Sequence, residues 1–198
     1  MSAPPVTVLQ ASPEEEAAIR AAVRAVNDRV LAGPEHVEGL LALFLDPRVS
    51  DPIYDLPRPF TRDSIARWVA DSRAAHARGE CILSVTLDEA GEVAGYSRIS
   101  VWPDRSSAEI AGAARADRQN AGRGRGGVSG AAAFMFETLG VRLIGLTAAL
   151  DNVRSIAAID GAGFVRRGER ETVRPDGTVR RSLYWELTRE AWRAGREG

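Results

Sequence analysis

A glycine-dense segment from Gln119 to Gly127, which reads QNAGRGRGG, has the residue types best suited to binding an anion. It lies between a predicted strand and a predicted helix, where backbone N–H groups at the start of the helix have no helical partners. These groups and the positive end of the helix dipole attract phosphate, and glycine allows close backbone approach. Arg123 and Arg125 add fixed positive charge. The segment therefore predicts a phosphate site, with a flexible surface turn as the alternative.

The same glycines also allow a weaker interpretation, a dinucleotide-binding turn of an NAD-dependent oxidoreductase. Gly122, Gly124 and Gly127 match G-x-G-x-x-G, and Asp151 stands at the end of the next predicted strand. Residues 115–121 separate the glycines from the preceding strand, however, and Asp151 lies more than about 20 residues from the first glycine. The spacing therefore argues against this interpretation.

The elements that position this segment follow from the apolar periodicity. Helices are expected over 13–30, 34–44 and 61–78, and Ser12 with Glu15 predicts a capping box for the first. Further along, we expect strands over 81–87, 93–101 and 108–114, a helix over 126–139, a strand over 141–150, a short helix from 151 or 152 to 161–163, and closing strands over 164–167 and 181–187. This order predicts a mixed α/β (α+β) fold, in a single domain over residues 1–198.

Composition limits the possible functions. The 198 residues are 44% hydrophobic and 27% charged with a net charge of -1, which indicates a globular protein and makes a nucleic-acid partner unlikely. All 26 basic residues are arginine, so Schiff-base chemistry and a lysine-containing phosphate loop are excluded. Cys81, His36 and His76 stand alone, so no metal site is expected. No apolar stretch reaches the ~18 residues of a membrane span, and the expected location is the cytoplasm.

Several short motifs, taken in order, resemble the GCN5-related N-acetyltransferases (GNATs). Gln119, Gly122 and Gly124 fit the Q/R-x-x-G-x-G/A pyrophosphate motif of that superfamily. From about Leu45 to Trp192 the chain is similar to its RimJ/RimL-like branch, which acetylates ribosomal protein N-termini. The other matching residues are Pro57, Pro59, Phe60, Thr61 and Asp63, then Glu109 and Ile110, then Asn152, Ser155, Gly163 and Phe164. Asn120, where glycine is common, and the small residues 111–114, where an aromatic residue is common, depart from the pattern.

The resemblance implies a GNAT-like domain with a central, mostly antiparallel, splayed sheet flanked by helices, and acetyl-CoA as the cosubstrate without a metal. An acceptor amine would attack the thioester directly, and a backbone N–H near Ala113 or Ala114 would stabilise the oxyanion. The residues implied to contact the cosubstrate are Ala113, Ala114, Gln119, Asn120, Ala121, Gly122, Arg123, Gly124, Arg125 and Asn152.

Two residues are candidates for proton transfer. The resemblance implies Glu109 as the base, with a structural carboxylate as the alternative, and Ser155 as the proton donor to the departing thiolate, with a helix-start hydroxyl as the alternative. The acceptor is expected to be a protein N-terminal α-amine or a small amine. A noncatalytic acyl-CoA-binding or regulatory module is the other functional hypothesis.

Arginines crowd the closing strands, and a solvated arginine face is the default expectation for Arg166, Arg167, Arg170, Arg174, Arg180 and Arg181. An exposed closing strand would also offer an edge for a homodimer.

Overall fold

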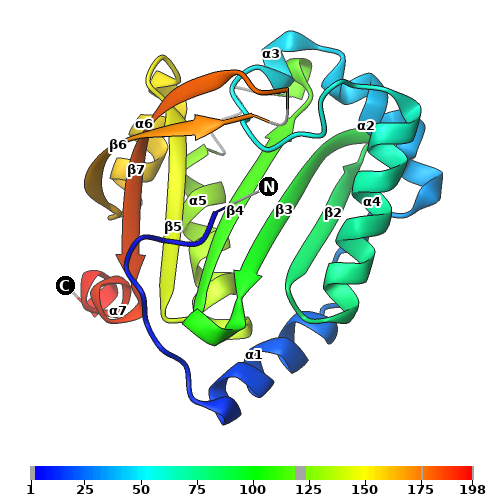
Figure 1. The fold of residues 1–198 in the computed structure, drawn as a ribbon. Helices are drawn as coiled ribbons and strands as arrows, with labels where there is room; N and C mark the ends of the chain where they lie inside the picture. The colour runs from blue at the N-terminus through cyan, green and yellow to red at the C-terminus, as the bar shows by residue number, and fades with distance from the viewer. Residues whose placement is uncertain (1–2, 119–123, 175, 198) are drawn as a thin grey trace.

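A single seven-stranded sheet forms the centre of the computed structural model, which describes residues 3–118, 124–174 and 176–197 (Figure 1). The strand order is β1-β2-β3-β4-β5-β7-β6, and all neighbouring strands are antiparallel except β4 and β5. The predicted mixed fold with a mostly antiparallel sheet is therefore confirmed. The strands are β1 (Val30–Leu31), β2 (Cys81–Leu87), β3 (Val93–Trp102), β4 (Ser107–Ala114), β5 (Leu143–Ala149), β6 (Val165–Val173) and β7 (Val179–Thr188).

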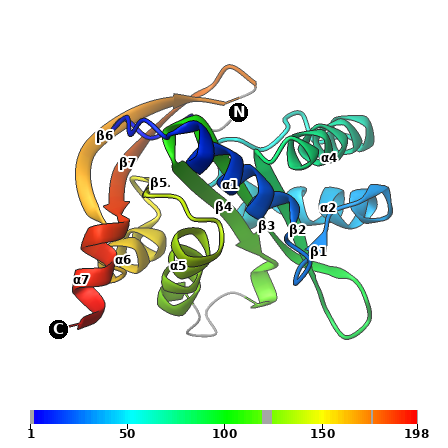
Figure 2. The same cartoon turned by 90° about the horizontal axis from the view of Figure 1, so that it is seen from below.

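Helices cover both faces of this sheet (Figure 2). Helices α5 and α6 lie on one face, helices α2 and α4 lie on the other, and α1 closes the end of the sheet beside the turn Pro103–Arg105 (η2). No helix among the described residues is both long and apolar enough to cross a membrane. The helices are α1 (Pro13–Arg24), α2 (Val37–Phe44), α3 (Pro47–Ser50), α4 (Arg62–Ala77), α5 (Gly124–Ala133), α6 (Val153–Gly161) and α7 (Arg189–Glu197). Short 3₁₀ turns form η1 (Pro34–His36) and η3 (Ala116–Arg118), and α5 continues as the π-helix η4 (Phe134–Thr138).

The sheet separates two hydrophobic cores because successive strand residues point to opposite faces. On β2, Ile82 packs in the core that contains α5 and α6, whereas Leu83 packs in the core that contains α2 and α4. In the second core, Phe44 contacts the rings of Trp68 and Tyr96 edge to face, at centroid separations of 5.7 and 5.0 Å. The helices on the two faces are thus fixed to the sheet independently.

The same geometry places a row of side chains on one face. Ser100, Glu109, Gly145 and Glu186 are direct register partners across β3, β4, β5 and β7. Register partners point to the same side of a sheet. We call this side the Glu109 face. Helices α2 and α4 pack on this side and leave the surface of β4 and β5 uncovered by a helix.

Some expectations for the N-terminal part were wrong. The first helix ends at Arg24 rather than Val30, because Val30 pairs with Val85 in the short strand β1. Ser12 caps α1 as expected, but the Glu15 side chain does not complete a capping box. It accepts a hydrogen bond from Ser106 at 2.7 Å and pairs with Arg142 instead. Tertiary contacts therefore override the local pattern at both ends of this helix.

Candidate functional site

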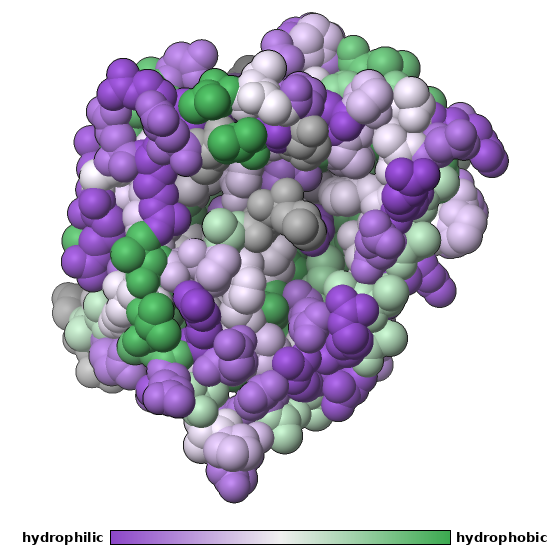
Figure 3. All heavy atoms as spheres, viewed as in Figure 1, coloured by the Kyte–Doolittle hydropathy of each residue, from purple (hydrophilic) through white to green (hydrophobic). Residues whose placement is uncertain are grey.

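A cavity of about 740 Å³ opens where β4 and β5 separate. Its walls come from these two strands, from α5 and α6 behind the sheet, and from the segment between α2 and α4 on the Glu109 face. Figure 3 shows this face, where hydrophilic and hydrophobic residues are mixed around the middle. The cavity therefore has access from both sides of the sheet, as a site that joins two substrates requires.

The gap between β4 and β5 leaves backbone groups available to a ligand. The strands pair only from Ser107 to Glu109, although β4 continues to Ala114. The Arg115 N–H bonds to Ala94 of β3, and backbone groups alternate in direction along a strand. The polar groups of Ile110 and Gly112 therefore point into the gap rather than toward β3. A linear ligand that carries amide groups fits this gap, because it restores the hydrogen bonds that a neighbouring strand would make.

Glu109 is the buried carboxylate of the cavity. It belongs to the last β4–β5 pair, and only 6% of the residue is exposed. The Tyr54 hydroxyl donates to its carboxylate, at 3.1 Å from Oε2 and 3.3 Å from Oε1. Tyr54 lies in the segment between α3 and α4, so this hydrogen bond joins the loop to the sheet. A carboxylate at the point where the strands part is well placed to accept a proton from a ligand in the cavity.

Arg180 completes the polar surroundings of Glu109. Its guanidinium lies 5.1 Å from the centre of the Tyr54 ring, bonds to the Pro52 carbonyl, and donates from Nε to Ser182 at 2.9 Å. Burial lowers the pKa of this guanidinium below its usual value, and Arg174 nearby lowers it further. Arg180 thus connects the β6–β7 hairpin to the loop that carries Tyr54. Together the hairpin and the loop form an arch over the Glu109 face (Figure 1).

The start of α6 supplies further residues to the cavity. The Asn152 side chain caps this helix by accepting the Ser155 N–H at 3.1 Å, and both residues line the cavity. Arg154 in the first turn of α6 and Arg118 in η3 also line it. These two arginines place positive charge beside the start of α6, and Arg48 and Arg180 line the cavity elsewhere.

The predicted site residues fall into three groups. Glu109, Ala113, Ala114, Asn152 and Ser155 all line this cavity. Gly124 and Arg125 begin α5, which forms another of its walls. Gln119, Asn120, Ala121, Gly122 and Arg123 lie outside the described residues. The structure thus brings together the motifs on β4 and α6, which are more than 40 positions apart in the printed sequence.

Tyr54 and Arg180 were not singled out from the sequence. Arg180 was expected on a solvated arginine face, but it is only 7% exposed. Its position could have been found from the alternation along β7, where Arg180, Ser182, Tyr184 and Glu186 all share one face. No comparable signal exists for Tyr54, because the loop that holds it has no periodic pattern.

Metal ligands are not gathered in the part of the chain that the structure describes, where no group of three or more His, Cys, Asp or Glu side chains could hold an ion. Cys81 is buried on β2, as expected, and burial raises the pKa of its thiol. A buried thiol of this kind is a poor nucleophile.

Comparison with solved structures finds the same fold in known acetyltransferases. The ribosomal-protein-S5-alanine acetyltransferase of Vibrio fischeri is 16% identical, with a TM-score of 0.68 over 82% of this chain and 92% of that one. RimJ of Mycobacterium smegmatis, solved with CoA-disulfide, is 19% identical, with a TM-score of 0.65 over 81% of this chain and 80% of that one. A spermidine N-acetyltransferase of Vibrio cholerae is 16% identical, with a TM-score of 0.65 over 85% and 98% of the two chains.

Sequence comparison identifies the family. No curated protein sequence matches the chain. The family model described as "Acetyltransferase (GNAT) domain" matches residues 30–165, which include Glu109, Asn152 and Ser155. The chain therefore belongs to the GNAT acetyltransferase family, whose cosubstrate is acetyl-CoA, as its glycine-rich segment and flanking motifs predicted.

Proposed function

We propose that this protein transfers the acetyl group of acetyl-CoA to a primary amine by direct attack, in the cavity between β4 and β5. The observation that carries the proposal is the position of Glu109, a buried carboxylate at the point where the two strands part. The cavity reaches that carboxylate from the α5–α6 side and from the Glu109 face. An acyl donor and an acceptor amine can therefore approach it from opposite sides of the sheet.

The residues behind the sheet would hold the cosubstrate. The backbone groups of Ile110 and Gly112 would bond the amides of its pantetheine arm, because they point into the gap. The start of α5, with Gly124 and Arg125, would face the diphosphate together with the segment 119–123. Asn152 would fix the adjacent turn of α6. The proposal assigns the charge of Arg118 and Arg154 to the same phosphates.

Glu109 would take the proton that the acceptor amine must lose. The amine nitrogen forms a bond to the acetyl carbon, the carbon–sulfur bond breaks, and the thiolate receives a proton, for which Ser155 is the proposed donor. The Tyr54 hydroxyl holds the Glu109 carboxylate in position. An α-amine has a pKa of ~8, whereas a lysine-type amine has one of ~10.4. Glu109 would therefore remove a proton more easily from a protein N-terminus than from a lysine-type amine. The alternation along β4 directs the N–H groups of Gly112 and Ala114 into the gap and that of Ala113 toward β3, so Gly112 or Ala114 is a better candidate than Ala113 for stabilising the oxyanion.

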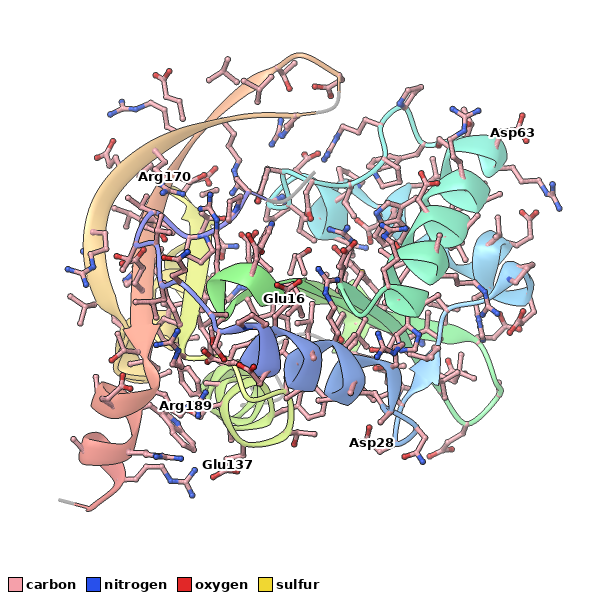
Figure 4. The ribbon with its side chains drawn as sticks, turned by 60° about the horizontal axis from the view of Figure 1, so that its bottom comes forward. Glu16, Asp28, Asp63, Glu137, Arg170 and Arg189 are labelled. Carbon is pink, nitrogen blue, oxygen red and sulfur yellow. The ribbon has the colours of Figure 1, made fainter. Side chains whose placement is uncertain are left out.

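The acceptor class is tested by a panel of amines. We expect CoA release with at least one of an N-terminal peptide amine, a polyamine, a free amino compound or an aminoglycoside. Glu109→Gln should lose turnover but still bind acetyl-CoA in a calorimetric titration. Glu137→Gln is the matched control, because Glu137 is exposed on the far side of the sheet, as labelled in Figure 4. Binding of acetyl-CoA without turnover of any amine would instead favour the noncatalytic module, and no binding would reject the site.

A further inference from the structure

A segment without helix or strand, Pro5–Gln10, bends at Val6 and Thr7 and crosses the Glu109 face before the chain enters α1, and we call it the strap (Figure 1). The strap lies outside residues 30–165, the part of the chain that matches the GNAT family model. In Figure 1 it runs from the described N-terminal end, in front of the middle of the sheet, across β5 and β7 to α1. It therefore precedes the matched part of the chain and lies on the side of the sheet from which an acceptor approaches.

Two side chains of β7 bind the main chain of the strap. The Val6 N–H donates to the Tyr184 hydroxyl at 2.9 Å, and the Thr7 N–H donates to Glu186 at 2.9 Å. The Thr7 hydroxyl donates to the other Glu186 oxygen at 2.6 Å. Two of these three bonds use backbone groups, which every residue except proline can offer. The contact therefore recognises two successive peptide N–H groups more than a particular side chain.

Tyr184 and Glu186 of β7 are held in position to accept hydrogen bonds from a peptide main chain. Glu186 is only 2% exposed, and Tyr184 donates to it at 2.6 Å. Burial raises the pKa of the Glu186 carboxyl, but the bonds from Thr7 and Tyr184 outweigh burial and hold it below the usual value. Arg170, labelled in Figure 4, lies 3.6 Å over the Tyr184 ring and fixes its outer side. A buried, charged acceptor of this kind needs N–H or O–H donors.

The strap reaches the neighbourhood of Glu109. Gly145 is the register partner of both Glu109 and Glu186, so it stands between them on the same face. A Cβ on Gly145 would lie 3.1 Å from the Pro5 side chain, which shows that Pro5 rests directly on this glycine. The strap thus covers the Glu109 face of the sheet as far as β5, the strand next to Glu109.

Pro5 is buried against the sheet, but most of the strap lies at the surface, and its residues belong to neither hydrophobic core. Val6 is 61% exposed and Val8 is 62% exposed, and Figure 3 shows hydrophobic surface along the path of the strap. The first fully buried side chain of α1 is Ile19, in a separate core. Release of the strap would therefore open the groove over β5 and β7 without unfolding α1.

We infer that the groove over β5 and β7 is a binding site for the main chain of a peptide acceptor, and that the strap occupies it as an internal competitor. This inference rests on the proposed function. Tyr184 and Glu186 would bind the N–H groups of the acceptor peptide just as they bind those of Val6 and Thr7. A small amine, which does not extend over β7, would reach Glu109 whether the strap is bound or released.

The test compares two full-length variants at one position. Thr7→Pro removes both the N–H and the hydroxyl that bind Glu186, whereas Thr7→Ser keeps both. We expect kcat/KM for a peptide amine to rise about tenfold in Thr7→Pro relative to Thr7→Ser, the value of one net hydrogen bond, with no change for a small amine. Equal changes for both acceptor classes, or no change for the peptide, would overturn the inference.

A binding measurement separates this inference from the proposed function. An N-acetylated fluorescent peptide with the sequence of residues 3–10, APPVTVLQ, should bind Thr7→Pro about tenfold more tightly than Thr7→Ser. Equal binding contradicts the inference even if no amine is ever acetylated, whereas absence of turnover in the wild type contradicts only the proposed function. If Thr7→Pro does not fold, Val6→Pro, which removes only the N–H bound by Tyr184, takes its place with the same expected results.

Discussion

The hydrogen bond between Tyr54 and Glu109 can be tested with a matched pair of tyrosine substitutions. Tyr54→Phe removes the hydroxyl that donates to Glu109 at 3.1 Å. Tyr96→Phe removes another buried hydroxyl, for which the described residues offer no hydrogen-bond partner. The two substitutions delete the same atom from two buried sites, so they differ mainly in the bond that is lost.

The expected magnitudes follow from these two environments. A hydrogen bond to a charged group contributes about 1.5–3 kcal/mol, and the long distances of 3.1 and 3.3 Å place this one at the lower end. We therefore expect Tyr54→Phe to lower the free energy of unfolding by about 1.5 kcal/mol. If the bond also positions the base in the transition state, kcat/KM falls about tenfold. Tyr96→Phe should leave stability unchanged or raise it by about 1 kcal/mol, because an unpaired buried hydroxyl is unfavourable.

Urea unfolding followed by circular dichroism measures the first quantity, and steady-state CoA release with the best acceptor of the panel measures the second. The reasoning is refuted if Tyr54→Phe matches the wild type in both assays, or if Tyr96→Phe is equally damaging. A loss of stability without a loss of kcat/KM would show that Tyr54 supports the fold and does not position the base.

Three further predictions concern other parts of the site. The lowered pKa of Glu186 contributes to the free energy of unfolding at neutral pH, and this contribution is lost as the pH falls below about 4.5 through the folded-state pKa. Glu186→Gln should therefore lower the free energy of unfolding by about 2 kcal/mol at pH 7 and reduce its decrease between pH 7 and pH 4, as urea titrations at the two pH values would show. Gly112→Ala should destabilise the protein by about 2 kcal/mol, because the added Cβ would lie 2.7 Å from the Tyr96 carbonyl oxygen. Gly126→Ala, in open space on α5, should stabilise it by about 1 kcal/mol, and thermal unfolding measures both effects. Asn152→Ala should cost about 1 kcal/mol by loss of the α6 cap and weaken acetyl-CoA binding in calorimetry; unchanged affinity would remove Asn152 from the cosubstrate site.

The sequence predicted those parts of the fold that local patterns control. Helix α4 begins after its Thr61 cap as expected, and the hairpin of β2 and β3 follows from two runs rich in β-branched residues that are joined around Ala90 and Gly91. Glu109 was found through a short motif on β4. Val30 was assigned to a helix because its spacing fits one, but pairing with β2 across more than 50 residues decides its conformation.

The site was predictable only for residues that belong to short sequence motifs. Tyr54 reaches Glu109 through a loop with no periodicity, so only the tertiary fold reveals the contact. Arg180 resembles its exposed neighbours in composition, and burial distinguishes it only after the register of β7 is known. The strap binds Glu186 from a separation of 179 positions, and no local pattern announces such a contact.

The most direct test of the central claim is a crystal structure of the protein with coenzyme A. The account predicts that the pantetheine arm lies between β4 and β5, bonded to the backbone of Gly112, with its sulfur near Glu109. Coenzyme A bound elsewhere on the molecule, or a gap closed by strand pairing beyond Glu109, would contradict it.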